Sequence, residues 1–417
     1  MKECVLFIEP RGTVLEVVRA AKNRGYAVVA LTSQPQLIHN AALPYRSAAK
    51  LIDEVISVTS WEEQASILEI VRTIQESFLI RGVYTGSDPC VVIAARIRQL
   101  VGLPTPTPDA FALVLNKYRL RTKLRQLGLS ELRSFHGSDV DTWKTWQING
   151  AAYFKPLHGF FSAYVQRCDS MSSLENARNE WKAGVKNEPP FVRNYLESLN
   201  EYHLEEAFDG ELLSVEGISS GGKFTALGLL SRILYSKNPI VEMGSCFPYP
   251  HPQAEKVVAL VGDAHRELGI TDGPTHTEVI VDATGGIEII DLNPRFVGAD
   301  VLQSINYAYG IKIQEALLDF ALGLPVTIAP HETHFSCIQY ILPPNVDQFE
   351  SIQFPTFPEV KFTSSFLEPG TKIRSYGKQL DYLGCYLTVM PAFRDAISRS
   401  QELRSLVVVN GQHQGDY

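Results

Sequence analysis

The chain has 417 residues, which is more than one ordinary hydrophobic core, so two to four domains or subdomains are expected. Hydrophobic residues make up 45% and charged residues 20%, and the net charge of −8 lacks the basic excess that a nucleic-acid surface needs. No apolar run reaches the ~20 residues that span a bilayer, and the N-terminal run is too short for a signal peptide, so we expect a cytoplasmic protein without membrane segments.

The first hundred residues alternate between strand and helix patterns. Strands are predicted at 5–8, 26–31, 55–58 and 82–85, and helices at 13–23, 61–75 and 90–100. Strands separated by helices of this length form parallel, doubly wound sheets. A ligand crevice would lie beyond the strand ends, at Glu9–Gly12 and Thr85–Asp88, although ordinary turns explain either loop equally well.

A proline-rich segment from Gly102 to Pro108 ends this alternation and predicts a domain boundary. From Ala151 onward the pattern becomes rich in strands, and after about Thr327 it shows short strands with proline and glycine turns. The helices predicted in this part of the chain are 109–127, 254–268, 313–322 and one around 392–406.

The six cysteines are far apart, and none forms a Cys-x-x-Cys pair. This distribution favours reduced, buried thiols over a disulfide framework or a zinc site.

The segment 275–298 is the most informative part of the chain. Glu278 lies on one alternating apolar run, and Asp291, Asn293 and Arg295 alternate along the next. Because strand side chains alternate faces, the last three should point the same way. Polar groups that converge from an apolar strand are costly unless they bind something, and Mg²⁺ with polyphosphate would suit them. A satisfied cluster of ion pairs around Arg295 is the alternative.

Two lysines are candidates for phosphate contacts. Lys155 precedes Pro156, which holds it in extended geometry, and its apolar neighbours favour a buried or cleft-lining position. Lys117 lies early in a predicted helix, where a solvated face is the simpler interpretation. The loop after Lys155 contains Gly159 and Ser162, and its backbone N–H groups could fold over phosphates.

The segment 202–217 is rich in acidic residues among strand-like apolar ones. The backbone of Ala207-Phe208, after two glutamates, could pair with an adenine edge where the chain crosses a cleft. Asp209-Gly210 predicts a turn, and Glu211 after it could hold a ribose diol. A hairpin with acidic side chains toward solvent explains the pattern equally well.

Two further motifs are weaker. Residues 217–224 nearly match a P-loop, but Phe224 occupies the place of the Mg²⁺-binding Ser or Thr, and a strand pattern follows. Gly221-Gly222 more simply predicts a hairpin turn. His276 could share a metal with Glu278, but no second histidine supports zinc, so we favour His276 as a substrate contact.

Taken in order, these elements resemble the ATP-grasp superfamily, and more narrowly its carboxylate–amine ligases of the L-amino-acid ligase kind. The resemblance extends to beyond residue 320 and is strongest at Glu278 and at Asp291-Leu-Asn-Pro-Arg295. It implies an α/β fold, α+β in the ATP-binding part, with a doubly wound N-terminal domain. The implied units are a Rossmann-like N-terminal domain (1–103), linker helices with a first ATP-grasp subdomain (104–195), a second ATP-grasp subdomain with the metal and acyl-phosphate site (196–326), and a C-terminal α+β subdomain (327–417).

The resemblance also implies residue roles. The implied ATP contacts are Lys117, Lys155, Ser162, Glu205, Glu206, Ala207, Phe208 and Glu211. The implied ligands of two Mg²⁺ ions, or of Mn²⁺, are Glu278, Asp291 and Asn293. The implied catalytic and substrate contacts are Arg295, His276 and Gly298. The chain departs from the family pattern at Asn116, where an acid is usual, at Asp291, where glutamate is commoner, and at the bulky Phe160 and Phe161 of the phosphate loop.

The function implied is an ATP-dependent ligase that activates a small carboxylate, such as an amino acid, as an acyl phosphate. Coupling to an amine would give an amide or dipeptide, with ADP and phosphate. We expect a homodimer, because enzymes of this kind are commonly dimers. The alternatives are a carboxylase-like or purine-pathway ATP-grasp enzyme, and a nucleotide-binding homologue without catalysis. The lack of a biotin-attachment segment disfavours the first, and the presence of the metal ligands disfavours the second.

Overall fold

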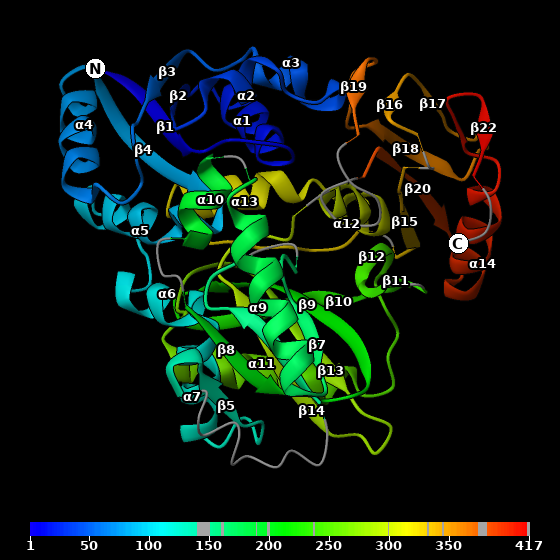
Figure 1. Cartoon of the computed structure of the whole chain (residues 1–417). Coiled ribbons are helices and arrows are strands. Elements are labelled where there is room, and N and C mark those ends of the chain that lie inside the picture. The colour runs from blue at the N-terminus through cyan, green and yellow to red at the C-terminus, as the bar shows by residue number, and fades with distance from the viewer. Residues whose placement is uncertain are drawn as a thin grey trace.

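The computed structural model describes residues 1–139, 151–159, 162–188, 190–197, 201–236, 238–298, 300–331, 333–343, 346–373 and 382–414 (Figure 1). The Phe160-Phe161 pair of the expected phosphate loop lies outside these residues. Within the described ranges, every helix falls short of the length and apolar character that crossing a bilayer requires.

The N-terminal domain is built on a four-stranded parallel sheet in the order β3-β2-β1-β4. Its strands are β1 (Lys2–Ile8), β2 (Ala27–Thr32), β3 (Glu54–Ser57) and β4 (Phe78–Thr85). Its helices are α1 (Val14–Asn23), α2 (Pro35–His39), α3 (Arg46–Ala49), α4 (Gln64–Ser77) and α5 (Val91–Leu100), with short 3-10 turns η1 (Leu43–Tyr45) and η2 (Asp88–Cys90). Strand β1 is central and fully buried from Cys4 to Ile8. The predicted doubly wound domain is confirmed, and its strand order reverses between β1 and β4.

The segment after this domain differs from the prediction. The single helix predicted at 109–127 is wrong, because the structure has two helices, α6 (Pro108–Leu115) and α7 (Lys117–Gln126). Asn116 between them is extended, and its side chain accepts a hydrogen bond from the backbone N–H of Arg119 at 3.0 Å. This is an N-cap, so the polar side chain that interrupts the apolar pattern starts a new helix.

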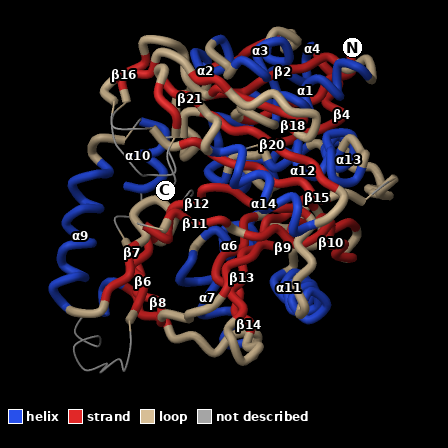
Figure 2. The backbone as a smooth tube through the Cα atoms, turned by 90° about the vertical axis from the view of Figure 1, so that its right-hand side faces the viewer, coloured by secondary structure: helices blue, strands red, loops and turns tan. Residues whose placement is uncertain are grey.

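The next part forms an antiparallel sheet in the order β5-β8-β6-β7. Its strands are β5 (Ser134–His136), β6 (Ala152–Pro156), β7 (Gln166–Cys168) and β8 (Tyr202–Glu206), and the turn η3 (Gly137–Asp139) follows β5. Helices α9 (Met171–Val185) and α10 (Pro190–Glu197) interrupt the region that was expected to be rich in strands. Helix α9 lies on the outer side of this sheet (Figure 2) and packs Leu174, Ala177 and Trp181 into its core.

A second antiparallel sheet has the order β10-β9-β13-β14. Its strands are β9 (Glu211–Ser220), β10 (Lys223–Ser231), β13 (Gly273–Val281) and β14 (Ile287–Asn293), and α11 (Ala254–Leu268) covers β9 and β10. The hairpin turn at Gly221-Gly222 is confirmed, as is the rejection of a P-loop, because a strand follows the turn. The alternative hairpin at Asp209-Gly210 is wrong, because β8 and β9 belong to different sheets and this link joins them.

The C-terminal part contributes to a five-stranded sheet in the order β11-β12-β15-β20-β18. Its strands are β11 (Ile233–Tyr235), β12 (Asn238–Phe247), β15 (Phe335–Ile341), β18 (Val360–Ser365) and β20 (Gly384–Met390). The remaining helices are α12 (Val301–Tyr309), α13 (Ile313–Ala321) and α14 (Phe393–Arg404), and the remaining short strands are β16 (Gln348–Phe349), β17 (Ile352–Gln353), β19 (Thr371–Lys372), β21 (Val408–Val409) and β22 (Gln412–His413). One hydrophobic cluster joins α1 to α12 and α13, so the N-terminal domain packs firmly on the rest of the molecule.

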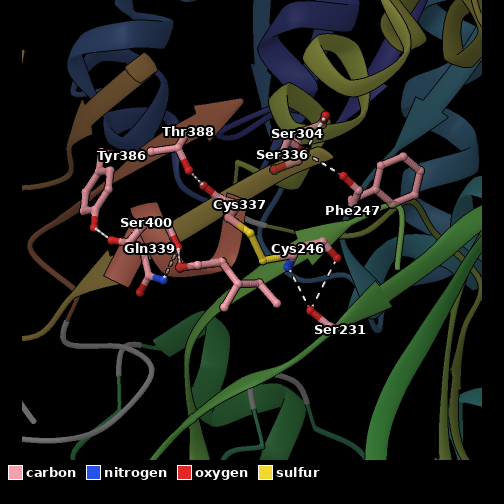
Figure 3. Close-up of a disulfide and its surroundings, with 11 residues drawn as sticks. Ser231, Cys246, Phe247, Ser304, Ser336, Cys337, Gln339, Tyr386, Thr388 and Ser400 are labelled. Atoms are coloured by element: carbon pink, nitrogen blue, oxygen red, sulfur yellow. Dashed lines mark hydrogen bonds between the residues drawn. A yellow bond between two sulfur atoms is a disulfide. The ribbon is translucent and has the colours of Figure 1, made fainter. Parts of the chain in front are cut away.

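The cysteines depart in part from the expected reduced thiols. Cys246 of β12 and Cys337 of β15 form a disulfide (Figure 3), whereas the other four cysteines are free and buried. The two residues are 91 positions apart in the sequence and become direct neighbours through the antiparallel pairing of their strands. Sequence spacing carries no trace of that pairing, which explains why the prediction failed for this pair.

Candidate active site

One pocket brings together nine of the residues singled out from the sequence. They are Lys117, Lys155, Ser162, His276, Glu278, Asp291, Asn293, Arg295 and Gly298. The other five, Glu205, Glu206, Ala207, Phe208 and Glu211, do not line it. The pocket therefore collects every candidate phosphate, metal and substrate contact except those of the expected adenine and ribose strip.

The acidic centre of the pocket follows from the register of two strands. Strands β13 and β14 are antiparallel, and they place Glu278 directly opposite Asp291 and His276 opposite Asn293. Asn293 Nδ2 lies 3.5 Å from Asp291 Oδ2. Opposed residues in such a pair share one face of the sheet. The alternation read from the sequence thus becomes two carboxylates and an amide on one wall.

Lys117 enters this wall from the start of α7. Its ammonium lies 2.5 Å from Asp291 Oδ2, and its backbone N–H donates to the carbonyl oxygen of Leu157 at 2.9 Å. Burial alone would lower the pKa of Lys117, but the Asp291 carboxylate outweighs burial and raises it. The solvated helix face considered for Lys117 is therefore wrong, because the N-cap at Asn116 turns the first residue of α7 inward.

His276 lies between two carboxylates, and Arg232 Nη2 is 3.1 Å from its Nε2. Its Nδ1 lies 2.6 Å from Glu216 Oε1, and its Nε2 lies 3.3 Å from Glu278 Oε1. Burial would lower the pKa of His276, but the Glu216 carboxylate outweighs it and raises the pKa to about 9. Glu278 is also 3.5 Å from Arg232, and these cations hold its pKa below the ordinary value against the effect of burial.

Arg295 connects the pocket to the N-terminal domain. Its Nε donates to Asp88 Oδ1 at 2.7 Å, and Asp88 lies in η2, directly after the end of β4. Burial would lower the pKa of Arg295, but Asp88 outweighs burial and raises it. The crevice expected at Thr85–Asp88 thus supplies a partner for the pocket arginine.

The acidic strip at the end of β8 is bonded to protein groups. Glu205 is buried and lies 2.9 Å from Arg121 and 2.5 Å from Lys155. Glu206 pairs with Arg133 at 2.8 Å, and Glu211 accepts a hydrogen bond from Tyr249 at 2.6 Å. Burial would raise the pKa of Glu205, but Arg121 and Lys155 hold it well below its usual range. Lys155 therefore touches both this strip and the pocket.

Five polar residues of the pocket escaped the sequence reasoning: Arg232, Glu242, Ser245, Tyr340 and Tyr382. All five lie in or next to the strands of the five-stranded sheet or the end of β10. The one visible signal was a charged residue, Arg232, at the end of a long apolar run. Of the remaining four, Glu242 and Ser245 lie on β12, Tyr340 lies on β15 and Tyr382 lies just before β20, so they meet only through the sheet.

The donor set of the acidic centre fits a hard cation. Among the described residues, no group of three or more His, Cys, Asp and Glu side chains is arranged to hold a metal ion. Glu278, Asp291 and Asn293 offer two carboxylates and one amide oxygen instead, and Mg²⁺ prefers oxygen ligands of this kind. In the structure Lys117 pairs with Asp291 and Arg232 lies beside Glu278, so two cationic side chains neutralise the two carboxylates. A bound metal ion would take over part of that neutralisation.

Sequence comparison identifies two domains in the chain. A sequence model of the ATP-grasp domain matches residues 151–303, and a model of the ATP-grasp N-terminal domain matches residues 18–105. Alanine–anticapsin ligase of Bacillus amyloliquefaciens is 21% identical over 274 residues, which is 62% of this chain and 57% of that protein. The corresponding ligase of Bacillus subtilis strain 168 is 18% identical over 357 residues, which is 79% of this chain and 74% of that protein.

Solved structures share the whole architecture. L-amino acid ligase from Bacillus licheniformis matches with a TM-score of 0.81 and 21% identity, covering 99% of this chain and 100% of the other. Phosphoribosylglycinamide synthetase from Anaerococcus prevotii matches with a TM-score of 0.73 and 14% identity, covering 98% and 99%. At these identities the likeness establishes the ATP-grasp fold and no activity.

Proposed function

The chain belongs to the ATP-grasp superfamily, and from that premise we propose that it is an ATP-dependent carboxylate–amine ligase that joins an amino acid to an amine. A carboxylate is a poor acyl donor because its oxygen leaves badly, whereas a phosphate leaves well. The reaction would therefore begin with attack of a substrate carboxylate oxygen on the γ-phosphorus of ATP, which releases ADP. An amine nitrogen then attacks the acyl carbon, phosphate leaves, and the amine loses a proton.

The observation that carries the proposal is the meeting of cations and hard oxygen ligands in one pocket. Lys117, Lys155 and Arg295 come from three different parts of the fold, and they line the same cavity as Glu278 and Asp291. Phosphoryl transfer needs positioning and charge neutralisation more than covalent help from the protein. The pocket supplies both through its charged side chains.

Glu278, Asp291 and Asn293 would hold Mg²⁺, and two ions are our expectation from the family resemblance. The bound metal would neutralise charge on the phosphate oxygens during transfer. Lys117 and Lys155 would hold phosphate oxygens, and Lys155 would keep its contact with Glu205 at the edge of the adenine strip.

Arg295 would act in the second step. It lies in the pocket beside Gly298, and Asp88 fixes its guanidinium at 2.7 Å, so the donor is in place before reaction. A preorganised cation at the position where an oxyanion develops stabilises the transition state. Val297 and Gly298 also line this cavity, and the backbone of residues 296–298 would contact the substrate.

The test is phosphate release and product mass measured over pairs of amino acids. We expect ADP and phosphate to appear in step with an amide product. ADP without a coupled product would favour a carboxylase-like or purine-pathway enzyme, and no hydrolysis with any pair would favour a nucleotide-binding homologue.

Arg295→Ala is the matching variant, and it should abolish amide formation while leaving nucleotide affinity largely intact. Loss of ATP binding as well would contradict the role proposed for Arg295. Arg295→Lys keeps a cation beside Asp88, so it controls for the buried carboxylate that the alanine variant leaves unpaired.

A further inference from the structure

One buried arginine outside the lining of the active-site pocket takes no part in the chemistry proposed above. Arg121 lies on α7, one turn after Lys117, and is 2% exposed. Residues four apart on a helix share a face, so the face that carries Lys117 into the pocket also carries Arg121. Helix α7 contacts both β8 and β14, which belong to different sheets. Arg121 is therefore placed where the two sheets approach each other.

The Arg121 guanidinium bonds to both sheets. On the β14 side, its Nη1 lies 3.2 Å from Glu288 Oε2 and its Nη2 donates to the carbonyl oxygen of Ile289 at 2.6 Å. On the β8 side, its Nε donates to Glu205 Oε2 at 2.9 Å. A buried charge is costly unless it is paired and hydrogen-bonded, and the planar guanidinium meets that condition because its donors point in several directions. One side chain thus connects β8 to β14.

Glu205 divides its carboxylate between two cations. Its Oε2 accepts from Arg121, and its Oε1 accepts from the Lys155 ammonium at 2.5 Å. Glu205 is 2% exposed and does not line the pocket. Its carboxylate is therefore a link between Arg121 and Lys155 inside the protein.

Lys155 stands between this carboxylate and the pocket. It is 8% exposed and lines the cavity in which we place the ATP phosphates. An ion pair is strong in a buried environment of low dielectric. Without Arg121, the whole charge of Glu205 would act on Lys155 alone. The ammonium would then be held against Glu205 and would be a weaker ligand for a phosphate oxygen.

The second carboxylate of Arg121 has no such connection. Glu288 also accepts from the Ser130 hydroxyl at 2.6 Å and from the backbone N–H of Glu131 at 2.9 Å. It is buried and does not line the pocket. The contact with Glu288 therefore fastens α7 to β14, whereas the contact with Glu205 leads to a pocket lysine.

We propose that Arg121 is a positioning residue that neutralises Glu205 and thereby leaves the Lys155 ammonium free to bind an ATP phosphate. Arg121 acts through Glu205 and needs no contact with the nucleotide. Its effect should appear in nucleotide affinity and not in the step that forms the amide. The inference rests on the proposed function, because it assumes that Lys155 holds phosphate oxygens.

The test is calorimetric titration with Mg²⁺ and an ATP analogue that has an imido group between the β- and γ-phosphates. Arg121→Met keeps a long apolar side chain and should weaken binding roughly 10-fold, the lower end for a hydrogen bond between charged groups. In turnover, the KM for ATP should rise while kcat changes little. Adenosine lacks the phosphates, so its affinity measured by competition should change little, whereas a general disturbance of the site would weaken both ligands.

Glu288→Gln is the matched control, because it alters the other buried contact of the same guanidinium. This variant should lower the free energy of unfolding, since Ser130 and Glu131 also lose a charged acceptor. The affinity for the analogue should stay near that of the wild type, because Glu288 does not bond to Lys155.

Glu205→Gln tests whether Arg121 acts through Glu205. It removes the negative charge that Arg121 neutralises, so Arg121→Met should cost less than about twofold in affinity when added to Glu205→Gln, as for two residues that act as a unit. A loss of roughly 10-fold in that background would overturn the inference. This comparison decides the question even if Arg121→Met alone folds poorly, because neither protein contains an unpaired Glu205 charge.

The wild type separates the two proposals. A wild type that does not bind the analogue would contradict the proposed function and this inference together. A wild type that binds it, with affinity unchanged in Arg121→Met or equally reduced in Arg121→Met and Glu288→Gln, would overturn the inference alone.

Discussion

The N-terminal crevice and the pocket both contain acidic side chains, but the partners of these side chains differ. Glu9 at the end of β1 is 2% exposed, and it accepts hydrogen bonds from the Ser33 backbone, the Thr32 hydroxyl and the Trp61 indole, besides its ion pair with Arg11. Glu278 in the pocket faces cations at 3.3 and 3.5 Å and is 22% exposed.

This difference separates a structural carboxylate from a ligand-binding one. The donors around Glu9 are fixed parts of the fold at short range, so its oxygens are committed to the protein. The cations around Glu278 are longer contacts at the edge of a cavity, so an ion or substrate can replace them. Of the two loops considered as a ligand crevice from the sequence, Glu9–Gly12 is therefore better explained by a structural role. The loop Thr85–Asp88 supplies Asp88, which accepts a hydrogen bond from Arg295.

The largest effect should come from removing the pocket carboxylate. Glu278→Gln keeps the shape but removes an anionic oxygen ligand, and we expect amide formation to fall roughly 10²- to 10³-fold, as for other preorganised electrostatic groups. ADP release at saturating ATP measures the loss. Glu9→Gln is the control, and comparable activity losses in the two variants would remove the distinction between the two sites.

Glu9→Gln should instead affect stability. Loss of the charged hydrogen bonds and of the Arg11 pair should lower the free energy of unfolding by about 2 kcal/mol, with activity of the folded protein within twofold of wild type. Urea denaturation followed by circular dichroism gives the first quantity. A stable Glu9→Gln protein with a strongly raised KM for ATP would show that the N-terminal crevice binds ligand after all.

The same contrast holds for two buried histidines. His265 has the neutral neighbours Ser219, Thr275 and Thr277, and burial lowers its pKa to about 3. The pKa of His276 is raised instead, because carboxylates lie beside it. The unfolded chain binds a proton at His265 below about pH 6.5 and the folded protein does not. Stability from this group should therefore fall as pH drops below 6.5, by up to about 1.4 kcal/mol per pH unit until pH approaches 3.

Unfolding free energies of the wild type and His265→Gln between pH 7 and pH 4.5 measure this effect. The difference between the two proteins should shrink as the pH falls. Parallel pH profiles would show that His265 is protonated in the folded state, against the burial argument.

The smallest effect should come from Glu206. Its pair with Arg133 is partly exposed, with side chains 28% and 44% exposed, and such pairs contribute roughly 0.5 kcal/mol or less. Glu206→Gln should also leave the KM for ATP within about twofold, because the adenine contact proposed for this strip uses the backbone. A large rise in KM would give the Glu206 side chain a direct role in binding nucleotide.

The sequence by itself determined the local elements and the chemistry of the acidic segment. Alternation along β13 and β14 predicted which side chains share a face, and apolar spacing predicted the parallel N-terminal domain. These features repeat over a few residues, so they are visible without any knowledge of the fold. The resemblance to ATP-grasp ligases followed from the order of such segments.

Only the tertiary structure decided which distant groups meet. The contact of Asp88 with Arg295 joins residues 207 positions apart, and the Cys246–Cys337 disulfide joins two strands 91 positions apart. The sharing of Glu205 between Arg121 and Lys155 joins three separate segments, and the turn of Lys117 into the pocket depends on a cap at Asn116. Which strands pair depends on the packing of the whole chain. A pattern read along one segment does not say which other segment will lie beside it.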